Sequence, residues 1–215
     1  MKYLTLSMLM LCVLGMTVSA QNTQKAKEIL DQVSAKTKTF SSISADFTFS
    51  LENLQEKISE SHNGSIKVKG NKYAVKLMGA ETYFDGINQW TYMKEAGEVQ
   101  VSVPDASDDN VLNPAKIFTM YEKGFKYTFI GEKTEAGKVL YEIDLYPENR
   151  DKPFSRIKLL IQKDNLQLYM LKQVGKDGNN YTVKVNKMQT NLSFSDADFT
   201  FNKTANPNVD VIDMR

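Results

Sequence analysis

Hydrophobic and polar positions alternate with a period of two along most of the chain after residue 43. The alternation begins with Phe47, Phe49 and Leu51, which are separated by polar residues, and it recurs as far as Phe199–Phe201. Such alternation is typical of strands that bury one face of a sheet. Turn residues such as Gly70-Asn71 separate most of the stretches. The pattern predicts about eleven strands in hairpin succession, and therefore an antiparallel sheet.

The residues before the alternating region have the spacing of a helix instead. Apolar side chains recur every three or four positions between Thr23 and Lys38, and polar side chains fill the other positions. This predicts one helix with a single apolar stripe, which needs an apolar surface to lie on. The stripe consists of Ala26, Ile29, Leu30 and Val33.

A second, shorter helix is expected where the alternation is interrupted. A polar, acidic stretch from Pro104 ends in Asn113-Pro114, which suits an N-cap followed by the first helical position. The next residues are apolar over most of a helix surface, so this helix must cover an apolar surface or be covered itself. They are Ile117, Phe118, Met120 and Tyr121.

A sheet of this many strands can enclose a space. Hairpin order favours a sheet curled towards a barrel over a Greek-key sandwich. Barrels of more than about eight strands are wider than side chains alone can fill. We therefore expect a mainly β fold with some α-helix, in which a curled or barrel-like antiparallel sheet surrounds an internal hollow. The candidates for the wall of this hollow are Phe47, Phe49, Leu51, Tyr73, Val75, Leu77, Trp90, Tyr92 and Val101, and the helical residues that could cover it are Ile29, Leu30, Val33, Ile117, Phe118, Met120 and Tyr121.

The same residues have a simpler interpretation. Aromatic side chains at a period of two are more often part of an ordinary filled core than of a ligand pocket. Flexible methionines favour the pocket, because they can repack around different ligands. The candidates for such adaptable surface are Met78, Met93 and Met120.

The first twenty residues have the features of a secretory signal. Lys2 precedes an apolar run, and Val18-Ser19-Ala20 supplies the small residues of a cleavage site. We expect a signal peptide at 1–20 and a single domain at 21–215, soluble in the periplasm. Cleavage would remove Cys12, the only cysteine, so the domain would depend on its core rather than on disulfides.

The charge of the chain argues against a nucleic-acid partner. There are 27 basic residues against 26 acidic ones, and removal of Lys2 with the signal leaves 26 of each. The densest basic cluster is Lys67, Lys69, Lys72 and Lys76, which we interpret as the solvated face or protected edge of a hairpin. A near-neutral chain without a strong basic block is not expected to bind nucleic acid.

The sequence offers little catalytic chemistry. The single histidine, His62, precedes Asn63-Gly64 and is interpreted as a solvated turn residue. We find no Gly-rich phosphate loop and no Ser-centred elbow. The acidic residues Asp105, Asp108 and Asp109 lack the ligand spacing of a calcium loop. We expect no enzyme, no metal and no cofactor.

Four stretches, in this order, resemble the periplasmic outer-membrane lipoprotein carrier (LolA-like) family. The first is 45–49 (ADFTF) after the amphipathic helix, and the second is 64–69 (GSIKVK). The third, 85–92, has the form Asp-Gly-x-x-x-Trp-x-Tyr and precedes the acidic loop and short apolar helix. The fourth, 196–201 (DADFTF), is followed by Val209 and Val211. The resemblance spans nearly the whole chain after residue 20.

The resemblance implies an incomplete antiparallel β-barrel of about eleven strands, in which the helical residues named above form a lid over an apolar cavity lined by the wall residues. It also implies a carrier of acylated lipoproteins. Such a monomeric protein would bind lipoprotein acyl chains in its cavity, receive them from an inner-membrane ABC lipoprotein-release transporter, and shuttle them to an outer-membrane acceptor where one exists. One position departs from the family: an arginine that contributes to lid closure is replaced in Lys69-Gly70-Asn71. Three alternatives remain: a periplasmic binding module for other lipids or apolar ligands, an envelope lipid sensor, and a structural β-domain with a filled interior.

Overall fold

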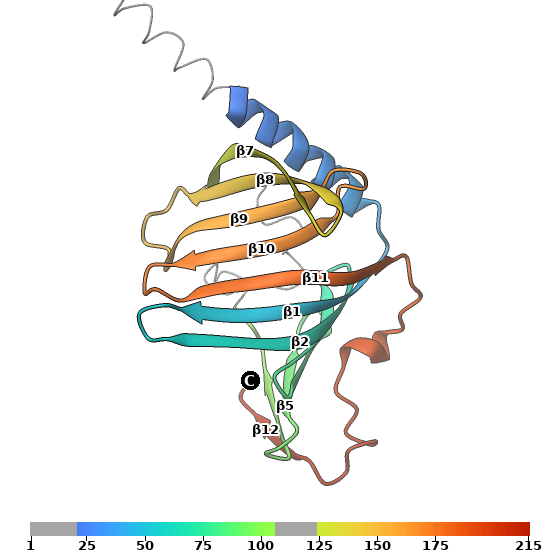
Figure 1. Ribbon diagram of the computed structural model, residues 1–215. Helices are drawn as coiled ribbons and strands as arrows, with labels where there is room; N and C mark the ends of the chain where they lie inside the picture. Colours follow the sequence, from blue (N-terminus) through green and yellow to red (C-terminus); the bar gives the residue numbers. More distant parts are fainter. Residues whose placement is uncertain (1–20, 106–123) are drawn as a thin grey trace, which may run out of the picture.

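The computed structural model describes residues 21–105 and 124–215, which form one α-helix, a short 3₁₀ helix and one open sheet (Figure 1). The α-helix spans residues 21–38, close to the expected 23–38. The strands are β1 (Ile43–Asn53), β2 (Ile58–Lys69), β3 (Lys72–Leu77), β4 (Ala80–Phe84), β5 (Gln89–Met93), β6 (Glu98–Ser102), β7 (Phe125–Glu135), β8 (Lys138–Pro147), β9 (Phe154–Gln162), β10 (Leu168–Gly175), β11 (Asn180–Thr190) and β12 (Asp210–Asp213).

The order of the strands confirms the expected hairpin succession. It is β12-β6-β5-β4-β3-β2-β1-β11-β10-β9-β8-β7, and every neighbouring pair is antiparallel except β12 and β6. The late strand β11 returns beside β1, so the early and late parts of the chain meet in the middle of the sheet. The mainly β fold with an incomplete, open antiparallel barrel is therefore confirmed.

The strand count differs from the expected number at three places. β4 was missed because both of its faces are half-buried, which leaves no alternation to detect. β12 was missed because all four of its residues are exposed. Phe199–Phe201, expected as a closing strand, instead contains the end of the 3₁₀ helix η2 (Asp196–Phe199).

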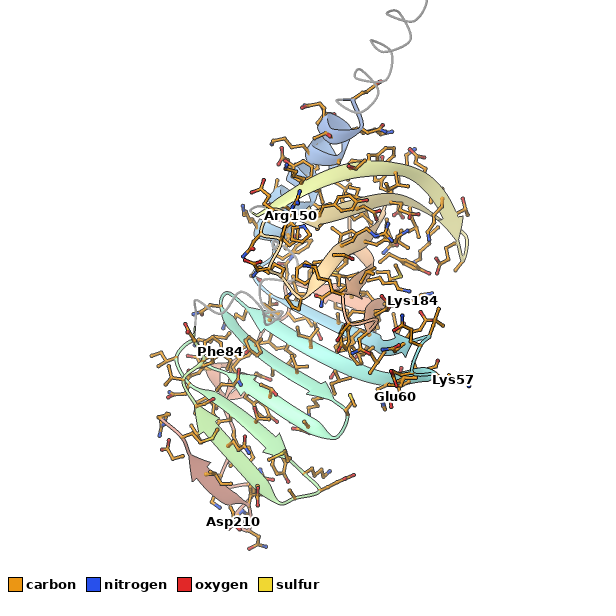
Figure 2. The ribbon with its side chains drawn as sticks, turned by 90° about the vertical axis from the view of Figure 1, so that its left-hand side faces the viewer. Lys57, Glu60, Phe84, Arg150, Lys184 and Asp210 are labelled. Atoms are coloured by element: carbon orange, nitrogen blue, oxygen red, sulfur yellow. The ribbon has the colours of Figure 1, made fainter. Side chains whose placement is uncertain are left out.

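The register defines two faces of the sheet. Phe47 is paired with Gly64, and Gly64 with Leu77. Directly paired residues of antiparallel strands point to the same face, so these positions and every second residue on either side share one face. The sheet curls around this face, which we call the concave face, and the opposite one is the convex face (Figure 2).

The N-terminal helix packs on the concave face. Its apolar stripe is buried, with Ala26 fully inaccessible, in one cluster with Ile143 and Leu159 of the sheet. The Lys25 ammonium lies 4.0 Å from the centre of the Phe129 ring, and Lys36 donates a hydrogen bond to the Asn165 carbonyl at 2.7 Å. These contacts place the helix over the β7–β10 part of the concave face. Figure 1 shows it at the β7 end of the sheet.

Some of the expected elements lie outside the described residues. They are the signal sequence 1–20 and the lid residues Ile117, Phe118, Met120 and Tyr121. Of the expected lid, the structure therefore places only Ile29, Leu30 and Val33, which are buried against the sheet.

The convex face of β2 and β3 holds the C-terminal segment, residues 194–209. Lys67 forms an ion pair with Asp198 at 2.7 Å, and Lys72 one with Asp196 at 2.8 Å. Lys69 donates a hydrogen bond to the Phe194 carbonyl at 2.6 Å. The basic cluster was interpreted as a solvated face or a protected edge, but three of its lysines bind this segment. Lys69, in the stretch that departs from the family's pattern, therefore points away from the concave face.

This attachment has a predictable pH dependence. The hydrogen bond from Lys67 is the main reason why the pKa of Asp198 lies below its ordinary value of 3.8. A carboxylate with a depressed folded-state pKa stabilises the fold above its unfolded pKa, and loses this contribution as the pH falls through the folded value. We expect Asp198→Asn to lower the melting temperature at pH 7, and the difference from wild type to shrink below about pH 4.

Thermal unfolding between pH 2.5 and pH 7 measures this effect. Asp164→Asn, at an exposed turn, is the control and is expected to change the melting temperature little at any pH. A difference between Asp198→Asn and wild type that persists unchanged at pH 2.5 would contradict the assignment.

Candidate ligand-binding face

The concave face presents a large apolar surface that the helix covers only in part. Side chains near the helix are buried, but a further set packs against this core and remains half-exposed. These residues come from both halves of the chain: Phe49, Val75, Leu77, Phe84, Phe125, Tyr127, Tyr141, Val183 and Val185. A contiguous, partly uncovered apolar surface is typical of a binding site for an apolar ligand.

Six of the expected wall residues lie together on this face. They occupy alternate positions of β1 and β3 and are joined through the paired residues of β2. Met93 lies on the same face, because it is paired with Ala80, which is paired with Leu77. The six are Phe47, Phe49, Leu51, Tyr73, Val75 and Leu77.

Trp90, Tyr92 and Val101 lie on the convex face, and their expected place in the same wall is wrong. Trp90 is paired with Tyr83 and Val101, which are out of phase with the concave positions. The Tyr92 ring lies 5.2 Å from that of Phe201, in the C-terminal segment. On this face Trp90 and Tyr92 are partly buried and are paired with the buried residues Val101 and Val99, respectively. The buried residues of the convex face, among them Val99, Val101 and Phe199, are called the second core. A place beside ordinary core residues fits the simpler interpretation considered above.

The Phe47 ring lies across β2 at the one position where β2 has no side chain on this face. A Cβ added at Gly64 would be 2.6 Å from Cζ of Phe47 and 2.9 Å from the Lys76 carbonyl oxygen. Both distances are shorter than real contacts allow, so any side chain here would displace the ring. Gly64, the first residue of the GSIKVK stretch, therefore leaves the space that the Phe47 ring occupies on the concave face.

Gly64→Ala is expected to lower the free energy of unfolding by about 1–3 kcal/mol, because overpacking a core contact has an effect of this size. Chemical denaturation measures it. In a Phe47→Leu background, which removes the ring atoms nearest to the added methyl group, the effect of Gly64→Ala should be smaller, because only the close contact with the Lys76 carbonyl oxygen remains. An equal loss in both backgrounds would show that the contact with Phe47 is not the cause.

Hydrogen-bonded and stacked aromatic residues fix the two ends of the β1–β4 wall. At one end the Tyr73 hydroxyl donates to the Gln89 side chain at 2.8 Å, and the Tyr73 ring lies 5.2 Å from Phe84. Burial raises the pKa of Tyr73, so its hydroxyl remains a neutral donor. At the other end, Phe49 stacks on Tyr181 with a ring separation of 6.2 Å.

Several wall residues were not anticipated from the sequence. Tyr181, Val183 and Val185 of β11 are paired with Leu51, Phe49 and Phe47 of β1, respectively. Their alternation was visible, but it could not show that a strand more than a hundred residues later lies beside β1. Phe84 was missed along with its strand, β4.

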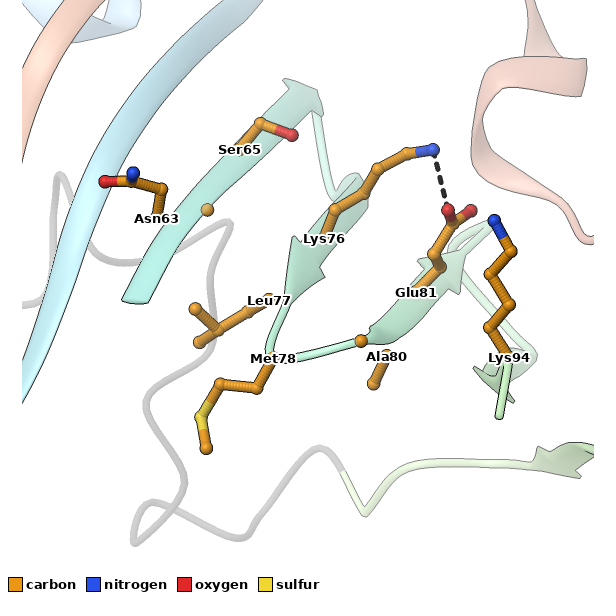
Figure 3. A pocket seen from close by; sticks show the side chains of 10 residues that line it. Asn63, Ser65, Lys76, Leu77, Met78, Ala80, Glu81 and Lys94 are labelled. Atoms are coloured by element: carbon orange, nitrogen blue, oxygen red, sulfur yellow. Dashed lines mark hydrogen bonds and ion pairs between the residues drawn. The ribbon is translucent and has the colours of Figure 1, made fainter. Parts of the chain in front are cut away.

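A small open cavity, which we call the notch, lies beside the turn between β3 and β4 (Figure 3). Its volume is about 330 Å³. The lining combines side chains of both faces with the turn itself: Asn63, Gly64, Ser65, Lys76, Leu77, Met78, Gly79, Ala80, Glu81 and Lys94. Met78, 57% exposed and in the left-handed conformation at φ 53°, puts a flexible apolar side chain at its rim. The notch is therefore lined by apolar residues of the concave face and by polar residues of the convex face.

The polar side of the notch is organised around Glu81. Lys76 forms an ion pair with it at 2.9 Å, shown dashed in Figure 3, and the Tyr83 hydroxyl also donates to this carboxylate. Burial raises the pKa of Glu81, but the hydrogen bonds from Tyr83 and Lys76 outweigh burial and leave the pKa lowered. With Lys94 nearby, the lining carries two cations and one anion.

His62 was expected in a turn, but the structure places it in a strand. It lies within β2 and is paired with Phe49, so its ring is on the concave face.

Across residues 21–105 and 124–215, no three His, Cys, Asp or Glu side chains are grouped so as to hold a metal ion. Asp108 and Asp109 of the acidic loop lie outside these ranges. Among residues 21–105 and 124–215, no helix has both the length and the apolar character needed to cross a bilayer.

The sequence matches the family described as outer membrane lipoprotein carrier protein LolA over residues 16–174. The chain therefore belongs to the LolA-like family, as the sequence resemblance indicated. Members described in this way are carrier proteins rather than enzymes. No curated protein matches the chain significantly.

Solved structures from several bacteria have a similar fold. An uncharacterised conserved protein from Thermus thermophilus aligns with a TM-score of 0.57 at 14% identity, covering 88% of this chain and 99% of that one. Lipoprotein LppX from Mycobacterium tuberculosis aligns with a TM-score of 0.51 at 13% identity, covering 78% and 96%. A DUF1329 family protein from Desulfovibrio piger aligns with a TM-score of 0.50 at 12% identity, covering 83% and 97%. At these identities the comparisons establish the fold alone.

Proposed function

We propose that this protein is a periplasmic carrier that binds the acyl chains of lipoproteins on its concave face and shuttles them from the inner to the outer membrane. The observation that supports the proposal is the set of half-exposed apolar residues beside the buried core, within a fold whose family is described as a lipoprotein carrier. Its partners would be an inner-membrane ABC transporter and an outer-membrane acceptor. The carrier would act as a monomer after removal of residues 1–20.

The thermodynamics of acyl chains explains why such a surface is needed. Each buried methylene is worth about 0.8 kcal/mol, so one chain of about sixteen carbons resists entering water by roughly 12 kcal/mol. A lipoprotein with several chains cannot cross an aqueous compartment at a useful rate without a matching apolar surface. The branched and aromatic side chains of β1, β3, β7 and β11 would supply this surface, since among the described residues they pack against the core and stay partly exposed.

The ligand must also be released, which limits how rigid the site can be. A carrier whose concave face was filled by its own side chains would have to break its core to accept a ligand. Here the core under the helix is fully buried, whereas the adjoining wall is not, so a ligand can add to the surface without disrupting it. Residues such as Met93 on this face can adjust to chains of different shape.

Native mass spectrometry of protein purified from the periplasm tests the proposal. Co-purified acylated polypeptide, removed when the protein is unfolded, is the expected result. Free lipid alone would favour a binding module or sensor for other lipids. A protein without any bound apolar molecule, and without affinity for an added lipopeptide, would favour a structural β-domain.

A further inference from the structure

Part of β2 has a free edge beside the candidate ligand-binding face. β2 is paired with β1 from Ile58 to Val68, but β3 covers only Gly64 to Lys69. Residues 58–63 therefore have β1 on one side and no described strand on the other. Ser59, Glu60 and Ser61 are exposed, as expected for such an edge. Its outward backbone N–H and C=O groups are available to an extended peptide.

The two outer edges of the sheet carry more of the features that discourage added strands than this edge does. At one end β12 is short and bears Asp210 and Asp213. At the other, β7 has an irregularity between Phe129 and Gly131, and charged residues on both sides of it. Short strands, charges and bulges are common protections of edges. In residues 58–63 the register with β1 is continuous, proline is absent, and Glu60 is the only acidic or basic residue besides the histidine.

The position of the free edge suits a ligand with an apolar and a peptide part. It begins at Asn63, which also lines the notch, and its concave side adjoins Phe49 and Leu51 of the apolar wall. On the convex side, Ser61 and Asn63 form polar contacts with β1, including one of 3.2 Å between the Ser61 and Ser50 hydroxyls. A strand added here would have one side over the apolar wall and the other in a polar environment.

We propose that the first peptide residues of an acylated ligand add to the free edge of β2 as an extra strand while its acyl chains occupy the concave face. The notch provides the passage between the two. Hydrogen bonds to the main chain do not depend on side chains, so this mode would accept many different polypeptides. The inference rests on the proposed function, because it requires acyl chains to be bound first.

Site-specific photo-crosslinking tests the position of the peptide. A benzophenone amino acid is placed at Ser59 or Ser61, and the control position is Lys126, which is exposed on the β7 edge. The probe is a diacylated lipopeptide of about eight residues with a biotin on its peptide part, a length that spans the edge at about 3.3 Å per residue. We expect biotinylated adducts at positions 59 and 61, and only background labelling at position 126.

Acyl binding is measured separately, by displacement of a fluorescent fatty acid, so that the two proposals fail in different ways. If the lipopeptide displaces the fatty acid but labels all three positions equally, or none, the strand proposal is wrong. Adducts at positions 59 and 61 that join two copies of the chain, or two parts of one chain, would also overturn it. If no displacement occurs, the carrier function itself is wrong.

A second lipopeptide tests the hydrogen bonds directly. It has the same acyl chains and the same sequence, but alternate backbone nitrogens are methylated, which prevents strand pairing. We expect it to bind about tenfold more weakly, because two or three main-chain hydrogen bonds are lost. Equal affinities of the two lipopeptides would overturn the proposal.

Discussion

Phe49→Asp is expected to weaken binding of a diacylated lipopeptide by about 100-fold. Phe49 lies on the concave face, half-exposed beside Tyr181, so its ring is accessible to a ligand. A carboxylate at this position must lose water when acyl chains cover it, and this penalty amounts to several kcal/mol. A loss of about 3 kcal/mol corresponds to roughly two orders of magnitude in the dissociation constant. Fluorescence titration measures the change.

The matched control is the next residue in the chain. Ser50 points to the convex face, where its hydroxyl contacts Ser61, so Ser50→Asp adds the same charge to the opposite side of the same strand. It should leave lipopeptide affinity within about twofold of wild type, since screened surface charges at a distance have small effects. Equal losses in the two variants would mean that neither face is specifically the binding face.

Phe199→Ala is expected to lower the free energy of unfolding by about 3–5 kcal/mol, the usual range for removing a buried phenylalanine side chain. Phe199 is completely buried at the end of η2, and Phe194 contacts its ring edge-on at a separation of 6.0 Å. Because η2 lies against β3 on the convex face, the loss should affect the second core rather than the ligand-binding face. Denaturant unfolding gives the stability change, and lipopeptide titration at low temperature should show an almost unchanged affinity.

Phe201→Ala is the comparison variant for Phe199→Ala, because it removes a nearby phenylalanine ring that is less buried. Phe201 is only half-buried against Tyr92, so we expect a smaller loss, about 1–2 kcal/mol. If Phe199→Ala were no more damaging than Phe201→Ala, the C-terminal segment would not be part of a core. A large loss of lipopeptide affinity in folded Phe199→Ala would show that the two faces are not independent.

The sequence was sufficient for the fold but not for assigning residues to faces. A period of two shows that Trp90 and Tyr92 share a face with each other. It does not say which face, because that depends on the register through every strand between them and β1. The strand missed between β3 and β5 was β4, whose residues are half-buried on both sides and therefore show no alternation. Without β4, the phase of β5 relative to β3 could not be derived.

Contacts between distant parts of the chain were equally hidden from sequence reasoning. The lysines at 67, 69 and 72 alternate as they would on a solvated strand, and only the fold shows that residues 194–198 cross over them. The same holds for β11 beside β1, which supplies Val183 and Val185 to the concave wall. Local patterns could predict Phe47, Phe49 and Tyr73 as wall residues because β1, β2 and β3 are consecutive hairpins.

Methyl NMR with a spin-labelled ligand tests most directly whether the concave face holds the acyl chains. Valines provide matched reporters, since Val75, Val183 and Val185 lie on the concave face, and Val99 and Val101 on the convex face. A lipopeptide with a nitroxide in the middle of one acyl chain should broaden the methyl signals of the first three and leave those of Val99 and Val101 sharp. Equal broadening of both sets, or broadening of Val99 and Val101 alone, would contradict the account.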